Sequence, residues 1–240
     1  MFNILKSKPF LKDLIPDGFI DIHSHILPGI DDGARDINES LKLISDLKKL
    51  GFSKIIGTPH VYPGLYDNSK KSIVKSFNVL IKKNDTDINI SYGCEYMIDF
   101  GLVLKAKKKS LITIKEKYVL IELGFMSAPI DYLDILFQIK ISGYVPILAH
   151  PERYSYLSKN DFFKIRNIGC HFQANLFSLT NFYGLKTTNT LKMLYQNNLV
   201  DFVGSDIHNF NSMTEFSKKI KINNYDKIEG SIEKNNLFGV

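Results

Sequence analysis

Short apolar runs alternate with helical patterns along most of this 240-residue chain, and that alternation limits the folds it can form. Strand-like runs occupy residues 18–23, 54–58, 88–94, 118–122, 145–149, 170–174 and 200–204. Helical patterns fall between most of them, at 36–50, 69–83, 131–142, 160–167 and 185–197. Repeated strand–helix units require parallel strands joined by right-handed crossovers. The sequence therefore predicts an α/β protein.

Two α/β architectures fit this pattern, an open doubly wound sheet and a closed barrel. The chain contains no G-x-G-x-x-G and no G-x-x-x-x-G-K-[ST] motif, which disfavours dinucleotide-binding and P-loop proteins. The placement of the histidines favours the barrel.

Five of the six histidines lie at or just past the carboxyl end of a predicted strand, and four acids share this placement. In a parallel barrel these ends meet at one mouth, where active sites are built. His171 lies inside a predicted strand, so we expect it to be structural. The nine candidate metal ligands are His23, His25, Asp32, His60, Glu95, Glu122, His150, Asp206 and His208.

The spacing of these donors suits metal binding. His23 and His25 are two residues apart on an extended backbone, so their side chains point the same way, and Asp206 and His208 repeat the spacing. Mixed imidazole and carboxylate donors suit Zn²⁺, Mn²⁺ or Fe²⁺. Nine donors indicate more than one metal, and two metals about 3.5–4 Å apart serve phosphoryl transfer. Position alone does not decide between Asp32 and its neighbour Asp31.

Composition excludes several classes of protein. No apolar run reaches the roughly 18 residues that span a bilayer, so we expect no membrane insertion. The net charge of +6 is carried mostly by lysines, which indicates a solvated surface with a mild attraction for anions. The densest lysine run, 105–109, lacks interleaved aromatics, so we expect no nucleic-acid site.

The two cysteines, Cys94 and Cys170, are isolated and cannot form a disulfide framework. The amino terminus also lacks the pattern of a secretory signal, so we expect a cytoplasmic protein. Neither cysteine begins a C-x5-R phosphate loop, which disfavours a phosphatase with a cysteine nucleophile.

Four motifs appear in order along the chain: Asp-Ile-His-Ser-His at 21–25, Thr-Pro-His at 58–60, Ala-His-Pro-Glu-Arg at 149–153 and Gly-Ser-Asp-Ile-His-Asn at 204–209. Together they resemble the polymerase-and-histidinol-phosphatase (PHP) superfamily of metalloesterases. The segments 27–34 and 92–96 resemble its bacterial tyrosine-protein phosphatase branch, which is linked to capsule and exopolysaccharide synthesis. The resemblance runs from 18 to 209. It predicts one PHP-type domain over 18–240, with residues 1–17 as an extension.

The resemblance implies a distorted TIM-like barrel of seven β/α units with two or three divalent metals. Manganese is the expected metal, with zinc or iron as alternatives. The first metal would be held by His23, His25, Glu95 and Asp206. Glu95 would bridge to a second metal completed by Glu122 and His150. The third would be held by Asp32, His60 and His208, and it is Asp32, not Asp31, that matches the family position.

Arg153 matches an arginine that binds the substrate phosphate in relatives. A guanidinium can grip a phosphate with two parallel hydrogen bonds, which agrees with that role. Asp206 or a neighbouring histidine would protonate the leaving group. Some relatives carry a second arginine after the Asp-x-His-Asn motif, but the segment 209–213 has none. A lysine elsewhere or the third metal would have to replace it.

The function implied by the resemblance is hydrolysis of phosphotyrosine, with the tail of a bacterial tyrosine kinase as the expected partner. Four aromatic residues near the expected mouth would suit a phenyl ring: Tyr62, Tyr66, Phe125 and Tyr154. Three alternatives stay open from the sequence: a small-molecule phosphatase of the histidinol-phosphate kind, a nuclease like the polymerase-associated relatives, and a non-catalytic metal- or kinase-binding module.

Overall fold

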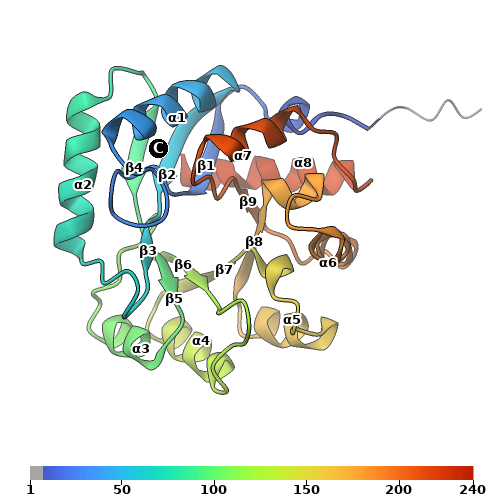
Figure 1. The fold of residues 1–240 in the computed structure, drawn as a ribbon. Helices are drawn as coiled ribbons and strands as arrows, with labels where there is room; N and C mark the ends of the chain where they lie inside the picture. The colour runs from blue at the N-terminus through green and yellow to red at the C-terminus, as the bar shows by residue number, and fades with distance from the viewer. Residues whose placement is uncertain (1–7, 240) are drawn as a thin grey trace, which may run out of the picture.

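In the computed structural model, which describes residues 8–239, parallel strands alternate with helices (Figure 1). The strands are β1 (Phe19–Ser24), β2 (Phe52–Gly57), β3 (His60–Val61), β4 (Asn89–Tyr92), β5 (Glu95–Met97), β6 (Tyr118–Glu122), β7 (Val145–Ala149), β8 (His171–Asn175) and β9 (Phe202–Gly204). The helices are α1 (Ile37–Lys49), α2 (Lys70–Lys83), α3 (Phe100–Lys107), α4 (Tyr132–Ile141), α5 (Lys159–Asn167), α6 (Leu185–Gln196), α7 (Phe210–Met213) and α8 (Tyr225–Lys234).

The strands form two sheets, with the orders β1-β2-β4 and β3-β5-β6-β7-β8-β9. Every neighbouring pair in both sheets is parallel. The prediction of an α/β fold with parallel strands is confirmed. Figure 1 shows the strands around a central region with the helices outside them.

Backbone hydrogen bonds connect the two sheets at two places. Pro59 lies between β2 of the first sheet and β3 of the second, and it has no N–H to donate to either. Its carbonyl nevertheless accepts a hydrogen bond at 3.1 Å from the N–H of Glu95, the first residue of β5 in the second sheet. On the other side, Asp206 N donates to His23 O at 2.8 Å and His25 N to Ile207 O at 2.9 Å. The carboxyl ends of strands from both sheets therefore lie around one opening.

Several elements differ from the sequence prediction, and the short strand β3 and the short helix α7 were not predicted. The strand expected at 88–94 is two strands, β4 and β5, separated at Gly93, where a Cβ would lie 2.6 Å from Ile114 Cγ2. Helix α3 was not predicted, although Asp99 caps it by accepting from Leu102 N at 2.7 Å. Helix α8 was also not predicted, and it buries Ile228 and Ile232, which are four residues apart on one face.

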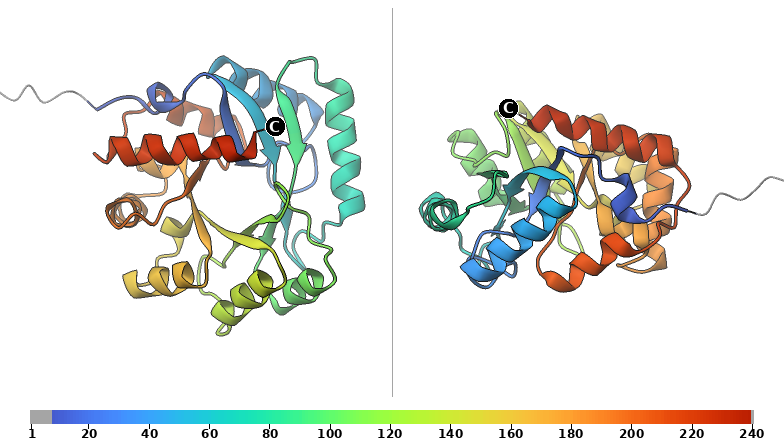
Figure 2. Two further views of the ribbon diagram at one scale, coloured as in Figure 1. Left: turned by 180° about the vertical axis from the view of Figure 1, so that it is seen from behind. Right: turned by 90° about the horizontal axis from the view of Figure 1, so that it is seen from above.

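The end of the fold away from the opening is filled by apolar side chains. Phe238 is fully buried there, with its ring 5.1 Å from that of Phe202 and 5.3 Å from that of Tyr118. Burying one such ring stabilises the fold by about 1.5–3 kcal/mol. Seen from behind, α8 lies across this side of the molecule (Figure 2). A small apolar cluster joins strands of both sheets: Ile20, Ile22, Ile56, Ile114, Leu120, Ile147, Ala149, Phe202 and Phe238.

The predicted amino-terminal extension is described only from residue 8 onward, and residues 1–7 lie outside the described part of the chain. A short 3₁₀ helix, Leu11–Leu14, packs against the carboxyl-terminal region, where Leu11 N donates to Lys218 O at 2.9 Å. Leu11 is fully buried. Among residues 8–239, the helices are all too short or too polar to cross a bilayer.

Candidate metal centre

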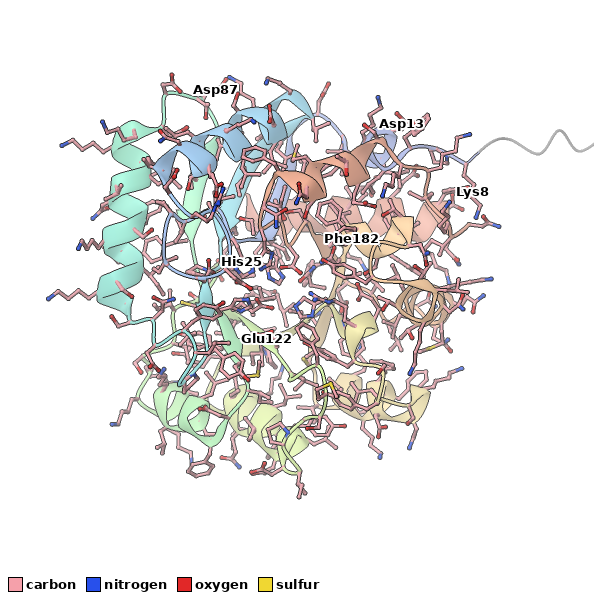
Figure 3. All side chains as sticks on the ribbon, viewed as in Figure 1. Lys8, Asp13, His25, Asp87, Glu122 and Phe182 are labelled. Carbon is pink, nitrogen blue, oxygen red and sulfur yellow. The ribbon has the colours of Figure 1, made fainter. Side chains whose placement is uncertain are left out.

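The nine predicted ligands lie together around the opening at the carboxyl ends of the strands. His23 is in β1, and His25 and Asp32 are in the loop that follows. The others lie in or just after β3, β5, β6, β7 and β9: His60, Glu95, Glu122, His150, Asp206 and His208. Figure 3 labels His25 and Glu122, which lie near the middle of the view, among the strands.

Eight of the nine residues form three groups in which all ligand atoms lie within 4.8 Å of one another, and His150 belongs to none of them. The first group matches the set predicted for one metal: His23, His25, Glu95 and Asp206. The second contains the set predicted for the third metal and adds His25: His25, Asp32, His60 and His208. The third group is His60, Glu95 and Glu122.

The predicted second metal differs from the third group in one ligand. Sequence reasoning placed His150 with Glu95 and Glu122, whereas the structure places His60 there, with His60 Nδ1 2.9 Å from Glu122 Oε1. His150 Nε2 instead lies 2.9 Å from Glu95 Oε1. Glu95 thus contacts both histidines, and it is the group that the first and third sets share.

Three buried atoms in this centre have no hydrogen-bond partner: His60 Nδ1, Glu95 Oε2 and Glu122 Oε1. They converge, because His60 Nδ1 lies 3.1 Å from Glu95 Oε2 and 2.9 Å from Glu122 Oε1. Buried polar atoms are nearly always satisfied, and imidazole and carboxylate atoms pointing at one position are what a divalent transition metal requires. The residues present therefore fit a bound metal.

Electrostatics in the centre are dominated by the buried carboxylates. Burial alone would lower the pKa of His23, but the charges of Glu95 and Asp206 raise it to about 9. Burial would likewise raise the pKa of Glu95, but the nearby histidines hold it well below its usual range. The pKa of Asp206 is also held well below its usual range, against the effect of burial, mainly by His23 and His208. Both carboxylates are thus ionised and ready to bind a cation.

The raised pKa of His23 predicts a pH dependence of metal affinity. The metal-free protein holds a proton on His23 up to about pH 9, and a metal ion must displace it. Affinity should therefore rise with pH, by about tenfold per unit for one displaced proton. Competition with a chelating indicator between about pH 6.5 and 8.5 measures this. A flat profile would show that His23 is neutral in the metal-free protein.

The same shift has a consequence for folding. Since the folded pKa lies above the unfolded one, His23 contributes stability that is present below about pH 6.5 and is lost as the pH rises towards 9. Metal binding should offset this loss, because the ion then replaces the proton. Denaturant titrations of the metal-free protein at about pH 6.5 and about pH 9 compare the two free energies of unfolding.

The rings of two predicted ligands, His25 and His23, are held by partners that the sequence did not reveal. His25 Nδ1 lies 2.7 Å from Asp31 Oδ2, and His23 Nδ1 lies 2.8 Å from Gln173 Oε1. An acceptor on one ring nitrogen fixes the tautomer and turns the other nitrogen towards a metal. Asp31 also accepts hydrogen bonds from Gly33 N and His60 N. The structure thus gives the adjacent aspartates different positions, Asp32 among the donor groups and Asp31 behind the ring of His25.

Replacing Asp31 by Asn should weaken metal binding about 10–100-fold, the usual cost of losing an outer partner of a ligating histidine. The amide has nearly the same shape and its oxygen still accepts a hydrogen bond, but without the negative charge it holds the proton on His25 Nδ1 less strongly. Metal affinity is measured by competition titration. The matched variant is Asp46→Asn in α1, where the partly exposed Asp46 pairs with Lys49 away from the donor groups. It should bind metal as the unaltered protein does.

Two of the predicted ligands sit on strained backbone at the ends of their strands. His150 has φ 33° and Asp206 has φ 53°, a region that non-glycine residues seldom adopt. Such conformations persist where the surrounding structure enforces them, and they gather at functional sites. Gly204 permits the close approach beside them, since a Cβ there would lie 2.6 Å from His23 Cβ.

Arg153 lies between two aromatic rings at the edge of the centre. Its guanidinium carbon is 4.3 Å from the ring centroid of Phe125 and 4.3 Å from that of Tyr183. Its NH1 donates to Asp206 Oδ2 at 3.0 Å. This stacking holds the guanidinium plane in one orientation, and about a fifth of the side chain stays exposed to solvent.

A buried network behind Asp206 was also missed by sequence reasoning. Asn175 Nδ2 donates to Asp206 Oδ2 at 2.8 Å and to Tyr183 Oη at 3.1 Å. Glu152 accepts from Asn175 N at 2.8 Å and from Ser178 Oγ at 2.7 Å. Asparagine, glutamine and tyrosine bear no pattern that separates such partners from ordinary core residues, so only their three-dimensional placement identifies them.

Of the four aromatics expected near the mouth, Tyr62 is part-buried and lines a separate hollow with Met97 and Gly124, and the other three divide into two kinds. Tyr154 is fully buried; its hydroxyl accepts from Leu123 N at 2.9 Å and lies 3.3 Å from His150 Nδ1, so it orients that ligand. Tyr66 stacks on His60 with ring centroids 5.5 Å apart, and Phe125 is 46% exposed. Those two rings remain available at the rim.

The other residues singled out by the sequence lie apart from the donor groups. His171 is 3.3 Å from Asp201 and is absent from all three groups of donors in the described chain. Cys94 and Cys170 are both buried, and burial raises the pKa of each thiol to about 12. Neither thiol can serve as a thiolate nucleophile.

The fold and the donor set together define an α/β protein with a candidate metal centre at the carboxyl ends of parallel strands. Residues 19–228 match the family model described as capsular polysaccharide synthesis, CpsB/CapC. The chain belongs to this family.

Similar proteins are named as tyrosine-protein phosphatases. The tyrosine-protein phosphatase YwqE of Bacillus subtilis is 32% identical over 196 residues, which cover 79% of this chain and 77% of the relative. The tyrosine-protein phosphatase CpsB of Streptococcus agalactiae is 31% identical over 208 residues, covering 82% and 86%. A solved structure, from work on YwqE of Bacillus subtilis and CpsB of Streptococcus pneumoniae as metal-dependent tyrosine phosphatases, matches with TM-score 0.71. It is 30% identical and covers 80% of this chain and 81% of that chain.

Proposed function

We propose that this protein is a metal-dependent protein-tyrosine phosphatase that acts in capsule or exopolysaccharide synthesis. The observation that carries the proposal is the convergence of unpartnered, buried donor atoms from His60, Glu95 and Glu122 beside Arg153. The family and the relatives named as tyrosine-protein phosphatases support it.

The first metal would be held by His23, His25, Glu95 and Asp206, and a second by Glu95 and Glu122 with His60 or His150. Asp32, His60 and His208 would hold a third. Bound metals would supply Lewis acidity and a water of lowered pKa. We propose manganese as the native metal, with zinc or iron as alternatives.

Arg153 is the group that binds the substrate phosphate. Its planar fork matches two phosphate oxygens, and the rings of Phe125 and Tyr183 keep that plane fixed. Since the guanidinium also donates to Asp206, one side chain links the phosphate to a ligand of the metal centre. Charge that develops on the phosphate oxygens is then stabilised by a donor already in place.

The protonation state of the site favours a tyrosine ester over a serine ester. The pKa of Asp206 lies well below its usual range, against the effect of burial, because of His23 and His208. Asp206 therefore suits ligand binding and the anchoring of Arg153 better than proton donation. A phenolate, with a pKa near 10, leaves with less help from an acid than an alkoxide does. The part-buried ring of Tyr66 and the exposed ring of Phe125 border the place where a phenyl ring would enter.

Several finer features belong to the same proposal. We infer that the two sheets form one distorted barrel of seven β/α units, a view supported by the backbone hydrogen bonds that connect them. Residues 18–240 would be one PHP-type domain, with 1–17 as an extension. The partner would be a phosphotyrosine-containing protein, such as the tail of a bacterial tyrosine kinase, and the place of action the cytoplasm.

The test measures phosphate release by protein stripped of metal with a chelator, with and without added Mn²⁺. The substrates are a phosphotyrosyl peptide, the matching phosphoseryl peptide and histidinol phosphate. We expect release that depends on the metal and is much faster from the phosphotyrosyl peptide. Faster turnover of histidinol phosphate would assign a small-molecule phosphatase instead. Tight metal binding without release from any ester would assign a non-catalytic module.

A further inference from the structure

A groove of about 500 Å³ runs beside the metal centre, between helix α2 and the loop that joins β1 to α1. Its loop wall includes Ile30, Arg35 and Ile37. Its helix wall consists of Asn68, two residues before α2, and one face of the helix: Ser72, Lys75, Ser76 and Val79. The groove therefore carries one cation on each wall, Arg35 and Lys75.

Helix α2 is strongly basic. Its sequence, Lys-Lys-Ser-Ile-Val-Lys-Ser-Phe-Asn-Val-Leu-Ile-Lys-Lys, contains no acid. Lys71, Lys75 and Lys82 are exposed and are spaced four and seven residues apart, so they lie on one stripe of the helix. In the described part of the chain, none of these three forms an ion pair. Figure 3 shows long side chains ending in nitrogen that extend from α2 into solvent.

The acids near the groove are already engaged. Asp36 lines it, but its carboxylate caps α1 by accepting from Asn38 N at 2.8 Å and Glu39 N at 3.0 Å. Glu39 pairs with Arg35 one turn away. The Arg35 side chain is 84% exposed, and an exposed pair of this kind exchanges readily for another anion. The groove thus offers cations whose charge is incompletely neutralised.

The groove borders the metal centre at two places. Asn68 Nδ2 donates to His60 O at 2.9 Å and to Ile30 O at 2.8 Å, so the wall of the groove is attached to the backbone of a candidate ligand. Arg35 also lines a second hollow, of about 370 Å³, together with Asp32 and Asn209. A chain that leaves the centre on this side therefore meets Arg35 first and the α2 lysines next.

We propose that this groove binds acidic residues next to the phosphotyrosine of the substrate protein, with Arg35 and Lys75 as the main contacts. The inference rests on the proposed phosphatase function and adds a substrate preference to it. Opposite charge selects partners and speeds their encounter, while Ile30, Ile37 and Val79 give the groove an apolar floor for the aliphatic parts of glutamate side chains. The metal centre would then select phosphotyrosine, and the groove would select its neighbours.

The experiment compares phosphotyrosyl peptides of one length on the metal-loaded protein. One has glutamates on the amino side of the phosphotyrosine, one has them on the carboxyl side, and one has glutamines on both sides. Phenyl phosphate reports on the centre alone. We expect kcat/KM for one glutamate peptide to exceed that of the glutamine peptide by about tenfold, through KM, and the preference to shrink as salt is added.

Charge reversal assigns the preference to the groove. Arg35→Glu and Lys75→Glu should each remove most of it while leaving turnover of phenyl phosphate unchanged. Lys192→Glu, on the exposed face of α6, should keep it. Equal kcat/KM for all three peptides, or a preference that survives both reversals, would overturn the proposal. If the unaltered protein did not hydrolyse phenyl phosphate, that result would instead count against the phosphatase function itself.

Discussion

Replacing Glu95 by Gln should abolish turnover and strip the centre of metal. Glu95 is the carboxylate that most of the centre shares: its Oε2 lies 3.2 Å from His23 Nε2, 3.4 Å from His25 Nε2 and 3.1 Å from His60 Nδ1. Its Oε1 lies 2.9 Å from His150 Nε2. The amide is nearly isosteric but carries no charge, and its NH₂ group would point at a metal or at an imidazole.

The expected loss of turnover is at least roughly a thousandfold. A bound metal contributes several kcal/mol of charge stabilisation, and each 1.36 kcal/mol is about a factor of ten in rate. Two measurements are needed, metal content by elemental analysis and turnover of phenyl phosphate with excess Mn²⁺. Far-ultraviolet circular dichroism checks that the variant is folded.

The control for this substitution is Glu229→Gln, which makes the same chemical change on the exposed face of α8. It should keep both metal and activity. If Glu95→Gln retained full metal content and full turnover, Glu95 would not be a ligand and the assignment of the centre would be wrong.

Replacing Arg153 by Lys should lower kcat/KM about a hundredfold while leaving the metal content unchanged. Lysine keeps the charge, but it cannot stack as a plane between Phe125 and Tyr183 or bind two phosphate oxygens at once. The loss of one fixed donor to a developing oxyanion typically costs about 10²–10³ in rate. Asp206 stays in place because Asn175 still donates to it.

The informative result is a loss of kcat/KM without a loss of bound metal. Steady-state kinetics on phenyl phosphate and metal titration of the same sample give it directly. Arg166→Lys is the matched control, since Arg166 pairs with Asp201 and donates to Leu199 O, away from the donor groups. Parallel loss of metal and activity in Arg153→Lys would mean that Arg153 only supports Asp206, and unchanged kcat/KM would mean that it does not touch the substrate.

Much of the architecture could be read from local patterns. The alternation of apolar strands and amphipathic helices sets the parallel α/β class, because each unit can bury its apolar face only against the next. The same pattern places the nine ligands: in parallel strands all carboxyl ends share a side, so residues after strands in the sequence meet in space. Asp206 and His23, 183 positions apart, are brought within 3.3 Å in this way.

Local patterns do not show where one strand becomes two. Pro59 and Gly93 interrupt the strands around β2, β3, β4 and β5, and the pairing resumes a few residues later. Whether the chain pairs again after such a break depends on which strand lies alongside, which is a property of the assembled sheet. Helices α3 and α8 were missed for a related reason, since their stability comes from the face that they bury.

The sequence alone predicted nine candidate donors and the side of the sheet that they share, and the structure gathers eight of them into the three donor groups. The tertiary structure decided which donors meet, placing His60 rather than His150 beside Glu122, and Asp31 rather than Asp32 behind His25. It also decided the partners that hold the donors, Gln173 and Asn175. The physical reason is that the direction of each strand can be read from the local pattern, and parallel strands place all their carboxyl ends on the same side of the fold. The distance between two side chains depends on register, backbone strain and the closure of many elements at once, which a linear pattern does not contain.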